Sequence, residues 1–404
     1  MATTGAGGLS RPRLERLDAA MHGYVERGEL AGVVTLVSRA EDLHVAAIGV
    51  QDLETGAPMR RDTIFRIASM SKPVTAAAAL MLVEEAKLRL DEPVDRLLPE
   101  LAERRVLRTI GSALDDTVPA SRPITLRDLL TFRMGFGAVM APPGTYPIQQ
   151  AMAEAGLAPG ADPAPFGPDE FMRRLGTLPL LHQPGEQWLY HTGSDVLGVL
   201  VARAAGTDLA TFLQQRIFGP LGMADTAFSV PDDKGERLAT AYRVDPASGR
   251  LAVYDRGRDG RWSRPPAFQA GGGGLVSTAE DYLAFARLLL QRGRHGAARL
   301  LARPTVELMT TDQITPAQKA ASPFVPGFWD VRGWGFGLAV VTGRDGLGPS
   351  VGSFGWDGGF TTSCYIDPRE QMVAILLTQR LMTSPAPANF YTDFWTLAYQ
   401  AIDD

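Results

Sequence analysis

The sequence predicts an α+β fold in which one antiparallel sheet, built from both ends of the chain, is flanked by helices and interrupted by a mostly helical insertion. Apolar runs typical of strands occur at residues 32–38 and 43–50 and return only near the C-terminus. From residue 88 to about 260 the sequence has the pattern of helices and loops. Of the 404 residues, 45% are hydrophobic, which is enough for a large core in two lobes.

The first elements are a helix and a hairpin. Leu14–Arg27 repeats apolar residues with helical spacing, and the two strands that follow are joined by the polar sequence Arg-Ala-Glu-Asp. A second helix is predicted over Thr75–Ala86, where alanines and other apolar residues follow Pro73, a residue tolerated in a first helical turn. Ser69 therefore lies at or near the N-terminus of this helix.

The later elements begin with a capped helix. Thr125 precedes an apolar run and has an acid, Asp128, three residues later, which is the pattern of a helix N-cap. Beyond it the predicted elements are helices at residues 194–205 and 209–218, strands at 335–342, 361–366 and 372–378, and a closing helix at 390–402.

This order of elements divides the chain into two lobes. Residues 1–90 and 270–404 are predicted to form an α/β lobe around the central antiparallel sheet, and residues 91–269 a helical lobe. A crevice between lobes is a usual place for a binding site, so we expect the active site there.

Two irregular stretches border the expected crevice. Residues 135–168 are rich in glycine and proline and too long for a simple connector, so we interpret them as a wall or lid over the site, with a disordered surface loop as the alternative. Residues 271–274 are four consecutive glycines that lead into a helix start at Thr278. A tight crossing between the lobes is the favoured interpretation of these glycines.

Composition and charge exclude several classes of function. A net charge of −5 without a Lys/Arg cluster argues against binding of nucleic acid or an anionic membrane surface. No segment approaches the ~18 apolar residues of a spanning helix, and no basic segment precedes an apolar one at the N-terminus, so we expect a cytoplasmic protein. Cys364 is the single cysteine, and the five histidines lack paired ligand spacing, so neither an internal disulfide nor a metal is expected.

Ser69 and Lys72 are the candidate catalytic pair. Only four of the 40 Lys and Arg residues are lysines, and a lysine, unlike an arginine, can lose its proton. Residues three apart share a helix face, so the amine can approach the hydroxyl. Burial would lower the pKa of Lys72 and leave neutral amine to take the serine proton. The alternative is a composition bias toward arginine, with Lys72 an ordinary lysine on a solvated face.

Ser350 is a rival nucleophile because its surroundings, Gly-Pro-Ser-Val-Gly, satisfy the Gly-x-Ser-x-Gly pattern of α/β-hydrolases. That pattern acts on a sharp turn from strand to helix, with an acid and a histidine later in the chain. No histidine follows Ser350, and the glycines at 355, 358 and 359 disfavour a helix. We therefore predict that Ser350 is a loop residue.

Six short motifs follow one another between residues 69 and 359. They are Ser69-Met70-Ser71-Lys72, Leu90-Asp91-Glu92-Pro93-Val94, Ile124 to Leu130, His182-Gln183-Pro184-Gly185 leading to Tyr190, Phe218-Gly219-Pro220-Leu221-Gly222-Met223, and Gly355-Trp356-Asp357-Gly358-Gly359. Together they resemble the serine β-lactamase-related superfamily, which includes class C β-lactamases, D-alanyl-D-alanine carboxypeptidases and family VIII carboxylesterases. The resemblance implies a β-lactamase/transpeptidase-like fold.

The resemblance also implies roles for three residues. Ser69 resembles the acylated nucleophile, Lys72 its proton partner, and Tyr190 the family tyrosine that acts as general acid and base. A tyrosine, with an ordinary pKa near 10, is a poor base at neutral pH unless a cation such as Lys72 stabilises the phenolate. The alternative is a core aromatic. Relatives often have asparagine two residues later, where this chain has Thr192, which puts the family's amide contact to the acyl group in question.

The last motif departs from the lactamase pattern. The Lys-Thr-Gly or His-x-Gly of lactamases and peptidases is replaced by Trp356-Asp357-Gly358, and family VIII esterases resemble this chain in having tryptophan there. A lysine would pair with a substrate carboxylate, whereas an indole offers apolar surface and one donor. The tryptophan therefore favours uncharged esters, with a packing aromatic as the alternative.

By the same resemblance, the oxyanion hole is formed by the backbone amides of Ser69 and Gly359. The residues after the tyrosine, His191 and Thr192, are candidates for contact with substrate, together with Trp356, Asp357 and Gly358.

The resemblance implies a serine hydrolase that cleaves small carboxylic esters through an acyl-enzyme, without a cofactor. The alternatives are a β-lactamase, a D-amino-acid amidase or peptidase, an acyltransferase with the same three residues, and, outside enzymes, an inactive ligand-binding descendant. The expected partner is a small-molecule ester or amide. The sequence leaves the choice between monomer and homo-oligomer open.

Overall fold

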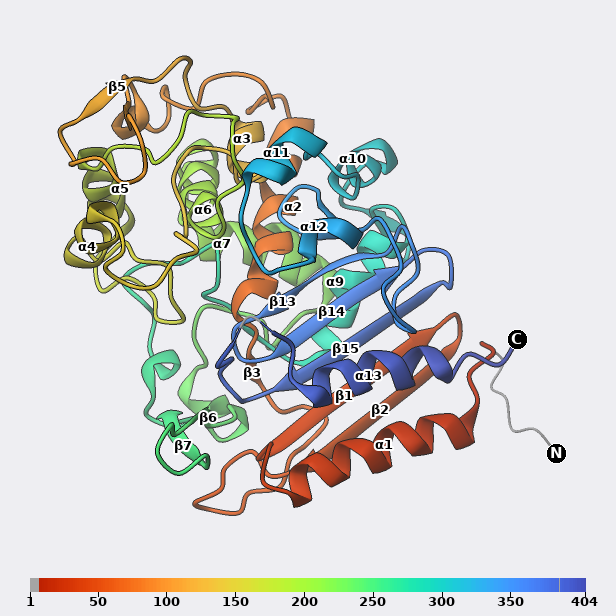
Figure 1. Ribbon diagram of the computed structural model, residues 1–404. Helices are drawn as coiled ribbons and strands as arrows, with labels where there is room; N and C mark the ends of the chain where they lie inside the picture. Colours follow the sequence, from red (N-terminus) through yellow and green to blue (C-terminus); the bar gives the residue numbers. More distant parts are fainter. Residues whose placement is uncertain (1–6, 385) are drawn as a thin grey trace.

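The computed structural model describes residues 7–384 and 386–404, and its centre is a seven-stranded antiparallel sheet (Figure 1). The strand order is β11-β12-β13-β14-β15-β1-β2. The N-terminal hairpin of β1 (Gly32–Arg39) and β2 (Asp42–Gly49) joins the C-terminal strand β15 (Met372–Thr378), with Val33 opposite Thr378. The prediction that both chain ends build one sheet is confirmed.

The C-terminal half of the sheet differs from the prediction, which placed no strand at residues 354–358 and a single strand over 335–342. Its strands are β11 (Arg332–Trp334), β12 (Ala339–Val341), β13 (Phe354–Gly358) and β14 (Thr362–Asp367). A single strand over 335–342 was wrong, because Gly335 donates to Leu338 O at 2.9 Å and Gly337 has a φ of 72°, so the chain turns between β11 and β12.

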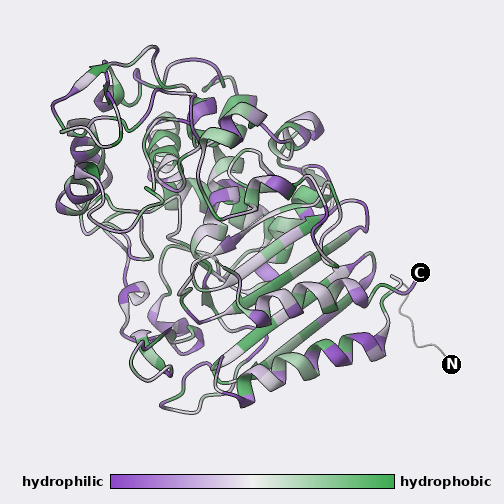
Figure 2. Cartoon of the chain, in the orientation of Figure 1, coloured by the Kyte–Doolittle hydropathy of each residue, from purple (hydrophilic) through white to green (hydrophobic). Residues whose placement is uncertain are grey.

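Alternate residues of the strands face different layers of helices. Val33 and Val37 pack with α1 (Arg11–Glu26) and α13 (Asn389–Gln400), which lie together on one face of the sheet (Figure 1). On the opposite face, α9 (Ala279–Leu290) contacts β14 and β15. Figure 2 shows hydrophobic residues concentrated along the strands, whereas α1 alternates between hydrophilic and hydrophobic residues, as its predicted amphipathic pattern requires.

The helical part of the chain packs on the same core. Its longest helix, α6 (Thr192–Ala205), lies against α2 (Ser71–Glu84). The predicted Thr125 cap is confirmed, because Thr125 and Asp128 form a capping box on α3 (Leu126–Leu130). Further helices are α4 (Pro147–Glu154), α5 (Pro168–Thr177), α7 (Leu209–Leu213), α8 (Gly219–Leu221), α10 (Arg303–Met309), α11 (Pro316–Ala321) and α12 (Phe328–Val331). Short 3₁₀ helices are η1 (Ala68–Met70), η2 (Pro99–Leu101), η4 (Asp232–Arg237) and η5 (Arg261–Ser263), and η3 (Gln214–Phe218) is a π-helix.

The expectation that residues 88–260 lack strands was wrong. Two small hairpins lie there, each with strands of three to five residues that are partly exposed, so neither carries the apolar run that marks a buried strand. The short strands are β4 (Arg105–Leu107) with β5 (Thr117–Pro119), β6 (Ala241–Val244) with β7 (Leu251–Asp255), and, elsewhere, β3 (Phe65–Arg66) with β8 (Val276–Ser277) and β9 (Arg294–His295) with β10 (Ala298–Arg299).

In the part of the chain that the structure describes, no individual helix has the length and apolarity needed to cross a membrane. Only Thr192–Ala205 taken together with Leu209–Leu221 passes on length and composition, and these two are bent by 78° at their junction.

Candidate active site

Ser69 lies at the bend where η1 leads into α2. Ala68, just before it, has a φ of 45°, a left-handed conformation that costs a non-glycine residue free energy and is found at functional sites more often than elsewhere. The neighbours Ala68 and Met70 are buried, whereas Ser69 is partly exposed. The bend therefore presents the Ser69 side chain at the surface of a cavity.

Lys72 lies one helical turn after Ser69 and has no exposed surface. Its Nζ atom lies 2.8 Å from Ser69 Oγ, as the spacing of three residues predicts, and donates to Gly272 O at 2.5 Å. Burial lowers the pKa of Lys72 to about 7, while the negative charge of Asp195 acts in the opposite direction. A large share of the amine is therefore neutral near pH 7, and Lys72 is not the solvated lysine of the alternative interpretation.

Tyr190 precedes α6 and faces the same pair. Trp356 Nε1 donates to its hydroxyl at 2.7 Å, and Lys72 Nζ lies 4.6 Å from the centre of its ring. Burial raises the pKa of Tyr190 well above its ordinary value, although hydrogen bonds with Ser69 and Trp356 lower it. The phenol therefore keeps its proton at neutral pH.

Trp356 is both a packing aromatic, which was the alternative drawn from the sequence, and a wall of the cavity beside Ser69. Its ring meets Trp334 edge-on with centroids 4.7 Å apart and belongs to a buried aromatic cluster that also includes Phe132 and Trp188. Its single donor is already bonded to Tyr190, so the indole offers a substrate its apolar surface but no free N–H.

The residues around Trp356 at the end of β13 differ in what surrounds them. Asp357 accepts hydrogen bonds from Ser363 and Tyr391, and burial raises the pKa of its carboxyl despite them. A Cβ atom added to Gly358 would lie 2.3 Å from Ile67 O, so only glycine fits this approach to η1. A Cβ atom on Gly359 would meet nothing within 4 Å. Gly359 therefore borders open space beside Ser69.

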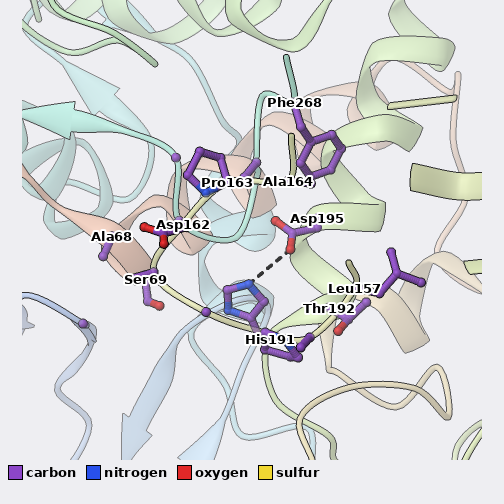
Figure 3. A pocket seen from close by; sticks show the side chains of 18 of the residues that line it. Ala68, Ser69, Leu157, Asp162, Pro163, Ala164, His191, Thr192, Asp195 and Phe268 are labelled. Carbon is purple, nitrogen blue, oxygen red and sulfur yellow. Dashed lines mark ion pairs between the residues drawn. The ribbon is translucent and has the colours of Figure 1, made fainter. Parts of the chain in front are cut away.

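His191, Asp195 and Gly272 surround the Lys72 amine. His191 Nδ1 lies 3.3 Å from Lys72 Nζ, and its Nε2 lies 3.1 Å from Asp195 Oδ2 (Figure 3). Asp195 and Gly272 were missed in the sequence. Two signals for them were available in the sequence: Asp195 lies four residues after His191 at the start of a predicted helix, and Gly272 lies in the run of four glycines. Thr192, the other predicted contact residue, is buried, and its Oγ1 has no hydrogen-bond partner among the described residues.

Two cavities meet at Ser69, Tyr190 and Gly359. One, which we call the loop cavity, has a volume of about 680 Å³ and is walled by residues 156–165, Phe171 and Phe268. Its wall belongs to the 135–168 segment that was predicted to border the site; that segment also contains α4. The other, the aromatic cavity, has a volume of about 690 Å³. It is lined by Met140, Phe324, Phe328, Trp356, Phe390 and Tyr391, among others.

The rival serine lies apart from this arrangement. Ser350 is fully buried in the loop between β12 and β13, where its amide donates to Asp367. It lines neither cavity that meets at Ser69. The prediction of a loop residue is confirmed.

Within residues 7–384 and 386–404, no group of three or more His, Cys, Asp or Glu side chains is arranged to hold a metal ion.

The sheet, its helices and the serine–lysine pair define the class of protein: a serine hydrolase with the β-lactamase/transpeptidase-like fold. The chain belongs to the Beta-lactamase family, whose model matches residues 17–394.

Similar proteins agree with this membership. Protein Rv1367c of Mycobacterium tuberculosis (strain ATCC 25618 / H37Rv) is 41% identical, over 91% of this chain and 90% of that protein. Esterase EstB of Burkholderia gladioli is 32% identical, over 90% of this chain and 89% of that protein. The solved structure of EstCE1, a hydrolase with promiscuous acyltransferase activity, matches with a TM-score of 0.79 and 26% identity, covering 96% of this chain and 98% of that chain.

Proposed function

We propose that the protein is a carboxylesterase that transfers the acyl group of its substrate first to Ser69 and then to water. The observation that carries the proposal is the Lys72 amine, which is fully buried, has a pKa of about 7 and lies 2.8 Å from the Ser69 hydroxyl. A neutral amine at this distance is a general base for the attack of Ser69 on an ester carbonyl. The similarity to Esterase EstB supports the ester as substrate.

The acylation step begins with Lys72 as the neutral amine and Tyr190 as the protonated phenol. Ser69 Oγ bonds to the carbonyl carbon while its proton passes to Lys72 Nζ. When the tetrahedral intermediate collapses, the carbon–oxygen bond to the alcohol breaks, and the leaving alkoxide takes the proton of Tyr190. The Lys72 ammonium then returns a proton to Tyr190. Because the pKa of Tyr190 is raised, the phenol is suited to donate this proton and Lys72 to accept the first one.

The amides of Ser69 and Gly359 are the proposed oxyanion hole. In the described residues neither amide donates to a carbonyl of a turn, loop or helix cap. A Cβ atom on Gly359 would meet nothing within 4 Å, so the described residues leave room for a substrate beside this glycine. Loss of one such donor typically reduces turnover about 10²–10³-fold.

The two cavities support a substrate with a sizeable group on each side of the ester. Aromatic rings such as Phe328 give the aromatic cavity apolar surface, although charged side chains also line it, and Trp356 stands where a lysine would pair with a substrate carboxylate. We therefore propose an ester without a charge beside the scissile bond. The cytoplasmic location stays a prediction from the sequence.

Mass spectrometry of the intact protein after incubation with an alkyl nitrophenyl phosphonate tests the nucleophile. The wild type and Ser350→Ala should each gain one adduct, and Ser69→Ala none. An adduct on Ser69→Ala would contradict the proposal, and no adduct on the wild type would favour the ligand-binding alternative. Efficient turnover of nitrocefin without turnover of short nitrophenyl esters would instead favour a β-lactamase.

Acyl transfer to an alcohol is a second candidate function. The aromatic cavity borders Ser69, is large enough to hold an alcohol and offers it the apolar rings of Phe328 and Trp356. EstCE1, described as having promiscuous acyltransferase activity, supports this candidate. Product analysis with an aromatic alcohol present distinguishes the two, because transfer yields a new ester and hydrolysis yields only the acid.

A further inference from the structure

His191 is held in a strained backbone conformation beside the proposed base. Its φ of 84° and ψ of −70°, together with a hydrogen bond from Thr192 N to Tyr190 O at 3.3 Å, form a three-residue turn centred on His191. Such a conformation costs of the order of 1–3 kcal/mol in a residue other than glycine. The turn directs the ring inward, where 14% of the side chain is exposed.

Four groups form a closed circuit of contacts around the amine. Lys72 Nζ donates to Gly272 O, and Gly272 N donates to Asp195 Oδ1 at 2.8 Å. The other oxygen of Asp195 contacts His191 Nε2, and His191 Nδ1 returns to Lys72 Nζ at 3.3 Å. Figure 3 shows the ring directed toward Asp195 at the edge of the loop cavity. The circuit brings together residues from α2, α6 and the glycine run.

Asp195 determines which ring nitrogen carries the proton. Although burial raises the pKa of its carboxyl, the contributions of His191 and Lys72 lower it below the ordinary value. Burial and the charge of Lys72 lower the pKa of His191, so the ring is neutral. A carboxylate only accepts hydrogen bonds, so Nε2 holds the proton and Nδ1 presents a lone pair.

The hydrogen-bonding capacity of the amine then fixes its orientation. A neutral amine has two N–H bonds and one lone pair, and Lys72 Nζ has three polar neighbours. Gly272 O accepts only, and His191 Nδ1 accepts in this tautomer, so both N–H bonds are used. The lone pair is left for the third neighbour, the hydroxyl of Ser69 at 2.8 Å.

We propose that His191, fixed in one tautomer by Asp195, is a positioning residue that directs the lone pair of Lys72 at the Ser69 hydroxyl. The inference rests on the proposed function, because it assigns Lys72 as the base. At the moment when Ser69 gives up its proton, the three N–H bonds of the ammonium point to Gly272 O, His191 Nδ1 and the Ser69 oxygen, so this first proton transfer does not rearrange the circuit.

The decisive substitution is Asp195→Asn. The amide oxygen still accepts from Gly272 N, but the amide NH₂ donates to Nε2 and forces the ring proton onto Nδ1. Nδ1–H then competes with Ser69 for the lone pair of Lys72. We expect the rate of Ser69 acylation by a nitrophenyl ester in a stopped-flow burst to fall about 30-fold or more, with KM changed less than about threefold; a wrong tautomer in a serine triad costs more. The measurement is made at pH 9, where Lys72 is neutral in both proteins.

Asp195→Asn removes a negative charge as well as changing the tautomer of His191, and these two changes have different expected effects on the pH profile of acylation. Asp195 raises the pKa of Lys72, so loss of the charge alone would move the acid limb of the pH profile to lower pH without slowing acylation at pH 9. A lower acylation rate of Asp195→Asn at pH 9 therefore indicates the changed tautomer of His191 and not the lost charge. Tyr190, Asp357, Asp162 and Tyr254 are titratable groups that line the two cavities at Ser69, and they are present in both proteins.

Variants of His191 complete the test. His191→Asn retains an acceptor near Nδ1 and tolerates the positive φ, so it should keep acylation within about fivefold of the wild type. His191→Leu has no acceptor and should lose about tenfold or more. Adding Asp195→Asn to His191→Asn should cost less than about threefold, because an amide can rotate to suit either partner.

The outcomes distinguish this inference from the proposed function. Equal losses from Asp195→Asn on the two backgrounds, or an acylation rate at pH 9 that no variant lowers, would overturn the positioning role while Ser69 still acquires the phosphonate adduct. Absence of the adduct on wild-type Ser69 would overturn both. If His191→Leu does not fold, the comparison of Asp195→Asn on the wild-type and His191→Asn backgrounds decides alone.

Discussion

The Nε1 atom of Trp356 donates a 2.7 Å hydrogen bond to the hydroxyl oxygen of Tyr190. The bond occupies the only donor of the indole and fixes the phenol of Tyr190 in a partly buried position next to Ser69 and Lys72. A tryptophan in this motif therefore does two things that a lysine would not: it removes a cation from the substrate site, and it orients the proposed proton donor through a neutral contact.

Trp356→Phe tests this orientation, because it keeps an aromatic ring and removes the donor. A neutral hydrogen bond contributes about 1 kcal/mol, so kcat/KM for a nitrophenyl ester should fall about fivefold. Trp334→Phe is the matched control. Trp334 lies in the same cluster, and its Nε1 has no hydrogen-bond partner within the described residues. Equal effects of the two substitutions would show that packing, and not the contact with Tyr190, is responsible.

The pKa of Lys72 predicts the pH dependence of the reaction. The active form of the base is the neutral amine, and its share grows as the pH rises through about 7. We therefore expect kcat/KM to rise about tenfold per pH unit below pH 7 and to level off above it. Initial rates with a substrate whose spontaneous hydrolysis is slow, such as an alkyl acetate followed by acid release, measure this profile. A limb near pH 10 would contradict a buried Lys72 as the base.

The same pKa predicts a change in stability. Between pH 7 and the ordinary value of 10.5, the unfolded chain binds a proton at Lys72 that the folded chain does not, so this group makes the free energy of unfolding rise with pH. Below pH 7 its burial is most costly. Lys72→Met removes this pH-dependent contribution. Between pH 7 and pH 10, the increase in the free energy of unfolding of the variant over the wild type should therefore be largest at pH 7 and shrink by about 1.4 kcal/mol per pH unit.

Urea unfolding of Lys72→Met and the wild type at pH 7, 8 and 9 gives this difference. Lys87→Met is the control, because the Lys87 side chain is 51% exposed. Its effect on the free energy of unfolding should stay constant over the same range. A difference for Lys72→Met that is independent of pH would mean that Lys72 folds in the same protonation state that it has when unfolded.

Local sequence patterns predicted one part of the site well. Ser69 and Lys72 lie three residues apart on one helix, so their contact follows from helical geometry alone. Strands β1 and β15 were predicted from their continuous apolar runs, which a strand needs when both faces of the sheet are covered. Strand β2, which is partly exposed at the edge of the sheet, was predicted with them because a short polar turn joins it to β1.

Other parts depend on contacts that no local pattern contains. Lys72 and Gly272 are 200 residues apart, and Asp195 and Gly272 are 77 apart, so their hydrogen bonds appear only after the helices pack. Strand β13 was not predicted as an element because glycine at both 355 and 358 lowers strand propensity. The strand forms because β12 and β14 pair with it on both sides.

The neighbouring glycines 358 and 359 should respond in opposite ways to alanine. A Cβ atom at 358 would lie 2.1 Å from Thr362 Oγ1 and 2.3 Å from Ile67 O, so Gly358→Ala must move backbone and should lower the free energy of unfolding by about 1–3 kcal/mol. At 359 the Cβ atom meets nothing within 4 Å, so Gly359→Ala should fold normally. Its methyl group would instead occupy the space beside Ser69 where both cavities meet, and kcat/KM should fall at least about tenfold through steric displacement of the ester from the oxyanion hole. Gly346→Ala, at an exposed glycine that also has open space, should change neither quantity. Thermal unfolding and ester hydrolysis measured on the three variants test these predictions. A wild-type kcat/KM for Gly359→Ala would contradict the assignment of Gly359 to the oxyanion hole.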